Sequence, residues 1–143
     1  MASLIILHLT FFKKCAGFPS TYSTASTCKY TFPKLSSDVC RIRLDFVDAT
    51  LANPSTTGAC TTDYFTGDQV TGNDIPPICG ENAGQHIYLD AGAYSTSSAS
   101  LSVVTTGTSD ERKWRILVSH IKCSSLTLPP QGCLQYHWGR EKI

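Results

Sequence analysis

The sequence lacks the features that mark several large classes of protein. No stretch approaches the roughly 18 consecutive apolar residues of a membrane-spanning helix. Basic residues number 12 and acidic residues 11, a formal net charge of +1. Binding to nucleic acid in bulk needs a strongly basic face, so it is not expected here. No window keeps the three-to-four-residue apolar spacing of an amphipathic helix. The composition therefore predicts a chain that is neither helical, nor membrane-spanning, nor nucleic-acid-binding.

Signatures of catalysis are equally scarce. The chain has four histidines, no Gly-x-Ser-x-Gly nucleophile elbow and no glycine loop of the phosphate-binding type. Ser119 and His120 are adjacent on a predicted strand, which places their side chains on opposite faces and rules out a shared triad. We therefore expect no catalytic residues, no cofactor and no enzyme activity.

Cysteine, by contrast, is abundant. Seven cysteines among 143 residues indicate an oxidising compartment, and hence a secreted protein with disulfide bonds. Residues 1–16 include a short apolar run suited to the core of a signal peptide, but no basic residue precedes this run and the cleavage site is poor. This segment is therefore predicted to be either a signal peptide or a non-native N-terminal segment.

Alternating apolar and polar residues dominate the middle of the chain. Residues 28–32 and 40–46 each put apolar side chains on one face and polar or charged ones on the other, as in antiparallel strands that cover a core. Turn-forming residues lie between them, so the pair is predicted to be a hairpin. Further strands are expected over residues 64–70, 86–90, 99–105 and 113–121. Short, regularly spaced strands without helices predict an all-β, two-sheet antiparallel sandwich.

The regular pattern stops after residue 123. We therefore place the sandwich domain over residues 17–123. Residues 124–143 are predicted to be a linker, Leu128-Pro-Pro-Gln-Gly132, followed by the start of an unfinished segment.

The hairpin geometry bears on cysteine pairing, although six cysteines allow 15 connectivities. With the turn centred near Lys34, Cys28 and Cys40 would lie opposite each other on one face, near the reach of a disulfide. Cys123 and Cys133 would then close a short loop, which leaves Cys15 over. An alternative for the C-terminal pair is a zinc site, because the spacing of two cysteines and two histidines is acceptable to zinc: His120, Cys123, Cys133 and His137.

The ordered series of motifs resembles a CUB domain. The motifs are Gly17-Phe-Pro-Ser-Thr-Tyr22, Cys28-Lys-Tyr-Thr-Phe32, Arg43-Leu-Asp-Phe46, Cys60-Thr-Thr-Asp-Tyr-Phe65 and Ile78-Cys-Gly80. Residues 38–46, 78–90 and 132–136 are most similar to the CUB-like domains of arthropod secreted proteins. The resemblance spans roughly residues 17–138. It implies a jelly-roll-like sandwich in a secreted, multidomain protein, and a disulfide between Cys60 and Cys79.

The resemblance also implies a function. CUB domains are extracellular, non-enzymatic modules that bind proteins or glycans, and we expect the same here. The alternative is a non-catalytic accessory domain of a secreted protease whose catalytic domain lies outside this chain. Many CUB domains bind calcium, and Asp63 matches one of their ligands. The matching glutamate position falls near Leu51 and the later loop offers only Asp110, so tight calcium binding is not expected. Asp63 is either a remnant ligand or a loop cap.

Two further groups of residues have alternative interpretations. His86 shares a strand face with Tyr88, and is expected either to be hydrogen-bonded within the fold or to contact a ligand. A basic cluster is expected to be a solvated strand edge, with a polyanion site as the alternative: Arg112, Lys113, Arg115 and Lys122. The sequence assigns neither a binding surface nor a ligand.

Overall fold

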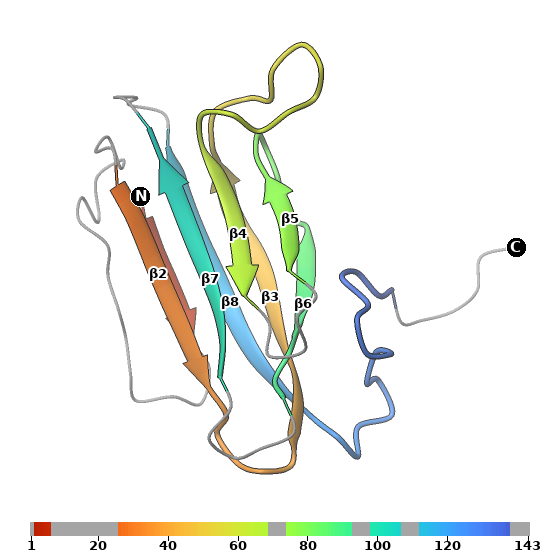
Figure 1. Cartoon of the computed structure of the whole chain (residues 1–143). Coiled ribbons are helices and arrows are strands. Elements are labelled where there is room, and N and C mark those ends of the chain that lie inside the picture. The colour runs from red at the N-terminus through yellow and green to blue at the C-terminus, as the bar shows by residue number, and fades with distance from the viewer. Residues whose placement is uncertain (1, 7–25, 69–73, 93–97, 107–111, 138–143) are drawn as a thin grey trace, which may run out of the picture.

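The computed structural model describes residues 2–6, 26–68, 74–92, 98–106 and 112–137, which form eight strands (Figure 1). In chain order these are β1 (Ala2–Ile6), β2 (Ser26–Pro33), β3 (Val39–Thr50), β4 (Tyr64–Asp68), β5 (Ile75–Ile78), β6 (His86–Asp90), β7 (Ser98–Thr105) and β8 (Lys113–Lys122).

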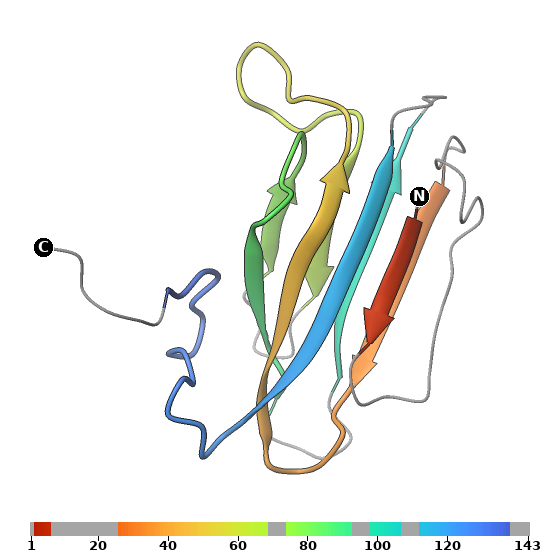
Figure 2. The ribbon, with the colours of Figure 1, turned by 180° about the vertical axis from the view of Figure 1, so that it is seen from behind.

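The strands form two four-stranded sheets that face each other as two layers. Sheet A has the strand order β1-β8-β3-β6, and sheet B has the order β2-β7-β4-β5. Sheet B lies nearer the viewer in Figure 1, and sheet A in Figure 2. All pairings are antiparallel except that of β1, which runs parallel to β8. The predicted all-β, two-sheet sandwich is confirmed.

The period-two pattern correctly identifies which side chains face the core. Along β3, Ile42, Leu44 and Phe46 are buried, whereas Arg43 and Asp45 between them are partly exposed. Large apolar and aromatic side chains from both sheets are fully buried and fill the space between them, among them Tyr30, Phe32, Phe46, Phe65, Leu101 and Trp114. Fully burying one such side chain stabilises the fold by about 1.5–3 kcal/mol.

The predicted hairpin is wrong, although both of its strands exist. β2 pairs with β7 in sheet B, whereas β3 pairs with β6 and β8 in sheet A. The connection after Pro33 therefore carries the chain from one layer to the other. The alternation is the same in either arrangement, because two strands that face each other across a core also turn their apolar sides inward.

This change of layer also corrects the cysteine pairing. Cys40 is bonded to Cys123 at the end of β8, not to Cys28, and Cys133 is a free thiol. The Cys60–Cys79 bond is confirmed. Cys28 is also disulfide-bonded. Cys15 lies outside the described residues.

Two strands were not foreseen. β5 contains two prolines, Pro76 and Pro77, which are rare inside a sheet. As the edge strand of sheet B, β5 tolerates residues that lack a backbone donor. β1 lies within the segment that is predicted to be a signal peptide or a non-native N-terminal segment. In the structure it is an edge strand of sheet A, next to β8.

Residues 124–137, the described part of the C-terminal segment, contain no strand but pack back on sheet A, beside β6 (Figure 2). Pro129 is buried, and Leu134 packs against the hydrophobic core. The backbone amide of Tyr88 in β6 donates a 2.8 Å hydrogen bond to the carbonyl of Leu134. Residues 129–137 therefore pack against the sandwich.

Candidate functional site

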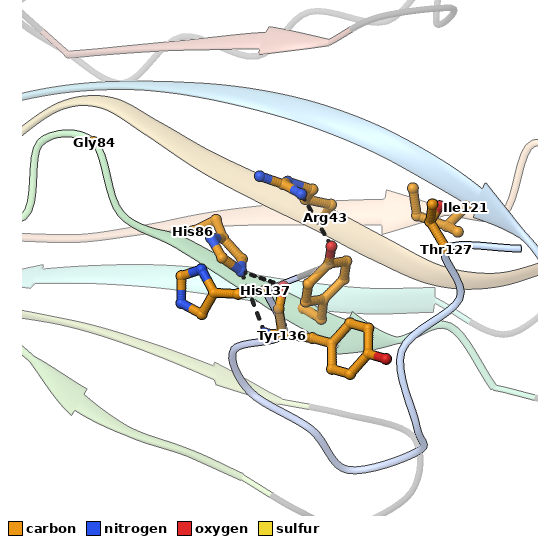
Figure 3. Close-up of a pocket in the computed structure, with 8 residues that line it drawn as sticks. Arg43, Gly84, His86, Ile121, Thr127, Tyr136 and His137 are labelled. Carbon is orange, nitrogen blue, oxygen red and sulfur yellow. Dashed lines mark hydrogen bonds between the residues drawn. The ribbon is translucent and has the colours of Figure 1, made fainter. Parts of the chain in front are cut away.

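A pocket of about 420 Å³ lies between the outer face of sheet A and the C-terminal segment (Figure 3). Sheet A and the turn before β6 contribute Arg43, Gly84, His86, Tyr88 and Ile121, and the C-terminal segment contributes Thr127, Tyr136 and His137. The pocket thus combines side chains from two parts of the chain that are far apart in sequence.

Strand register brings the sheet residues together. Arg43 on β3 is paired with Tyr88 on β6, and Asp45 with His86. Side chains directly opposite each other on an antiparallel pair share a face, and here that face is the outer one. Asp45, the acidic residue of this group, does not line the pocket.

The C-terminal segment is fixed to β6 at several points. The side-chain amide of Gln135 donates to the carbonyl of His86 at 3.0 Å. Gly132, whose positive φ of 79° suits a residue without a side chain, places its backbone amide 3.3 Å from the carboxylate of buried Asp90. These bonds continue along the edge of the sheet and hold Tyr136 and His137 over the pocket.

Arg43 supplies the permanent positive charge of the pocket. Its Nη2 lies 2.9 Å from the Asp45 carboxylate, and its Nη1 donates to the Tyr88 hydroxyl at 3.0 Å. The guanidinium carbon also lies 5.5 Å from the centre of the Tyr88 ring, within range of a cation–π contact. The hydrogen bonds to Asp45 raise the pKa of Arg43, which keeps it charged.

Two imidazoles lie next to this charge. The rings of His86 and His137 meet edge-to-face with centroids 4.9 Å apart, and His86 makes a similar contact with Tyr88 at 5.4 Å. His86 Nε2 lies 3.1 Å from the carbonyl oxygen of Tyr136 and 3.3 Å from its amide nitrogen. Burial and the nearby charge of Arg43 lower the pKa of His86, so the neutral form is favoured at neutral pH. The prediction of a hydrogen-bonded His86 is confirmed, and the side chain also lines the pocket.

Asp63 lies elsewhere, in a buried ion pair with Arg112. Its carboxylate accepts hydrogen bonds from Arg112 Nε and Nη2 at 2.9 and 3.0 Å, and from the amides of Ala52 and Thr106 at 3.1 and 3.2 Å. Both side chains are at most 1% exposed. This arrangement fits the loop-capping interpretation, because a calcium ion at Asp63 would have to displace four donors.

The zinc alternative at the C-terminus is wrong, because Cys123 is bonded to Cys40 and has no thiolate to offer. Among the described residues, no group of three or more histidine, cysteine or acidic side chains could hold a metal ion.

The basic cluster is also dispersed. Arg112 is buried with Asp63, Arg115 lies 3.1 Å from Asp48, and Lys122 lies 3.7 Å from Asp38. Three of its four cations thus have acidic partners, which argues against the polyanion alternative.

Sequence reasoning identified only part of the pocket. The sequence places His86 and Tyr88 together on one strand face, but it places Arg43 only on the charged face of another strand and Tyr136 in an unfinished segment. The sequence feature that could have indicated the site is a tyrosine close to a histidine, which occurs twice: at residues 86–88 and at residues 136–137.

Comparison with protein-family models and with curated proteins found no match to this chain. Within the part of the chain that the structure describes, no helix is long and apolar enough to cross a membrane.

Proposed function

We propose that the chain is an extracellular, non-enzymatic binding module of the CUB type, which recognises a glycan or a protein through the pocket on sheet A. The observation that carries the proposal is the composition of this pocket. One guanidinium, two imidazoles and two phenol rings converge on a space of about 420 Å³, which is within the range of small-molecule sites, about 300–1,000 Å³.

The walls of the pocket are held in place before any ligand arrives. Arg43 is oriented by Asp45 and Tyr88, and His86 by the backbone of Tyr136. Preorganised side chains lose little conformational freedom on binding, which favours affinity. Ligand binding makes direct use of the preorganised side chains of Arg43 and His86, and it requires no activated nucleophile.

The disulfides support an extracellular location. Cys40–Cys123 and Cys60–Cys79 are both formed, and such bonds persist in oxidising compartments. A two-layer sandwich with a Cys60–Cys79 bond is also what the resemblance to CUB domains implies.

Arrays of glycans and of extracellular proteins test the proposal with the full, oxidised chain. Tyr136→Ala removes one phenol ring from the pocket but keeps the backbone contacts of residue 136 with His86. Lys113→Ala is the control, because Lys113 is exposed and pairs with Thr50 at the far end of β3. We expect signals that persist in Lys113→Ala and fall by about tenfold or more in Tyr136→Ala, the loss that follows from removing a buried aromatic contact. Array signals that are unchanged in Tyr136→Ala, or an absence of array signals for the parent chain, would contradict the proposal.

A further inference from the structure

The side chains that line the pocket supply hydrogen-bond donors and one permanent positive charge, but no carboxylate. Its lining contains an arginine, two histidines, two tyrosines and a threonine, and none of the eight lining residues is acidic. A ligand group that faces this lining meets N–H and O–H donors and a permanent cation. Such a group is best satisfied if it accepts hydrogen bonds and carries negative charge.

The charge of Arg43 is open to competition by a ligand. Its acidic partner Asp45 is outside the pocket, and the two side chains are 36% and 30% exposed. Ion pairs at this exposure are weak, because water screens them. An anion in the pocket can therefore share the guanidinium with Asp45 without having to break a strong buried interaction.

The edge of β6 favours a compact ligand over an extended peptide. A peptide that adds a strand to a sheet needs free backbone groups at an edge. Here the amide of Tyr88 is bonded to Leu134, and the carbonyl of His86 to Gln135. The C-terminal segment thus already uses this edge. Phenol and imidazole rings, with a single aliphatic side chain at Ile121, instead suit the C–H face and hydroxyl groups of a sugar.

Resting on the proposed function, we infer that the pocket binds an acidic saccharide: a sugar whose carboxylate or sulfate lies beside Arg43, His86 and His137. Binding then takes up protons. The charged and titratable groups that face His86 are Arg43 and Asp45 from β3, Tyr88 from β6, and Tyr136 and His137 from the C-terminal segment. Asp45 is the one carboxylate among them and is already held by Arg43. A bound anion adds a second negative charge and favours the protonated form of His86, so affinity rises as the pH falls.

The test is a titration of the oxidised chain, by calorimetry and NMR, with five probes. These are lactose, a disaccharide that carries one uronic acid, sulfated lactose, a triglutamate peptide and inorganic sulfate. We expect the uronic acid, the sulfated sugar or both to bind at least about tenfold more tightly than lactose, which corresponds to one charge-assisted contact. The two acidic sugars show whether the pocket prefers carboxylate or sulfate.

A second arm measures the protons. Titrations at pH 6.5 in two buffers of different ionisation enthalpy should show net proton uptake with the acidic sugar and none with lactose. Affinity for the acidic sugar should fall by several-fold between pH 5.5 and 7.5. His86→Gln should flatten this dependence, and Lys113→Ala, which removes one charge outside the pocket, should keep it. Arg43→Gln provides a second variant with lower affinity at both pH values.

Several outcomes would overturn the inference while leaving the binding function intact. These are equal affinity for lactose and the acidic sugars, tighter binding of triglutamate, or inorganic sulfate that binds as well as sulfated lactose. If none of the five probes bound while the array signals still depended on Tyr136, the acidic-saccharide inference would also be overturned and the binding function would stand. If those signals did not depend on Tyr136, both proposals would fail.

Discussion

The indole nitrogen of Trp114 donates a 3.0 Å hydrogen bond to the hydroxyl of Tyr30, and both side chains are fully buried. Trp114 belongs to β8 in sheet A and Tyr30 to β2 in sheet B, so the bond joins the two layers through the core. A buried indole N–H without an acceptor costs free energy, and this pairing satisfies both polar groups within an apolar interior.

Tyr30→Phe should lower the free energy of unfolding by about 1–3 kcal/mol, because it leaves the Trp114 N–H buried without this acceptor. Tyr64→Phe is the matched control, since Tyr64 is partly exposed and lies on β4, which β7 separates from β2 in the same sheet. Denaturant unfolding followed by fluorescence measures both variants. Equal stability of Tyr30→Phe and the parent chain would show that the bond contributes nothing.

Phe46 and Val47 offer a sharper test of the strand faces. They are adjacent in β3 at an irregularity in the register with β8, yet Phe46 is 1% exposed and Val47 is 41% exposed. Phe46→Ala should cost about 3–5 kcal/mol of stability, whereas Val47→Ala should change it by less than about 0.5 kcal/mol. A reversed order in urea melts would place the apolar face of β3 toward solvent.

The disulfides Cys40–Cys123 and Cys60–Cys79 should contribute unequally to the free energy of unfolding. Cys40–Cys123 joins residues 83 apart in sequence and Cys60–Cys79 joins residues 19 apart. In the chain-entropy model the longer loop is worth about 4.5 kcal/mol and the shorter about 3 kcal/mol. Paired Cys→Ala variants, compared in denaturant melts, should follow this order. Peptide mapping without reduction should recover both bonds and find Cys133 alkylated, and a Cys123–Cys133 peptide would contradict the arrangement.

The Asp63–Arg112 pair should make the free energy of unfolding decrease as the pH falls into the acidic range. Burial alone would raise the pKa of Asp63, but the hydrogen bonds from Arg112, Ala52 and Thr106 outweigh it and lower that pKa. A depressed folded-state pKa contributes stability above the unfolded value, about 3.9, and this contribution is lost as the pH falls through the folded value.

Asp63→Ala should therefore destabilise the chain at pH 6 by about 3–5 kcal/mol, because the buried charge of Arg112 loses the carboxylate that neutralises it. Asp63→Asn keeps the shape and should show a shallower loss of stability below pH 4. Melts between pH 2.5 and 6 measure both. An unchanged acid slope in Asp63→Asn would assign the slope to other carboxylates.

Calcium should not stabilise this domain. The oxygens of Asp63 already accept four hydrogen bonds, so the residue cannot coordinate an ion without losing them. Melting curves with millimolar calcium and with chelator should coincide, and calorimetry should detect no sub-millimolar site. A calcium-dependent rise in melting temperature that disappears in Asp63→Asn would restore the remnant-ligand interpretation.

Local patterns were enough to determine the fold class and most of the strands. The span of β6, residues 86–90, was predicted as it is found, and those of β7 and β8 to within one residue. Period-two alternation reports which side of a strand is buried, and this depends only on neighbours along the chain. The Cys60–Cys79 bond followed from the resemblance of its surroundings to a known pattern.

Partnership between strands was decided only by the tertiary structure. β2 and β3 show the same alternation whether they lie side by side or in opposite layers, so Cys40 was assigned the wrong partner. The pocket depends on the same kind of long-range information. The sequence places Arg43 only on the charged face of its strand and Tyr136 in an unfinished segment. These residues meet because β6 pairs with β3 and because Gly132 and Gln135 bond to the edge of β6. Hydrogen bonds between residues about 40–50 positions apart leave no period in the sequence, because each is a single contact that only the folded chain brings together.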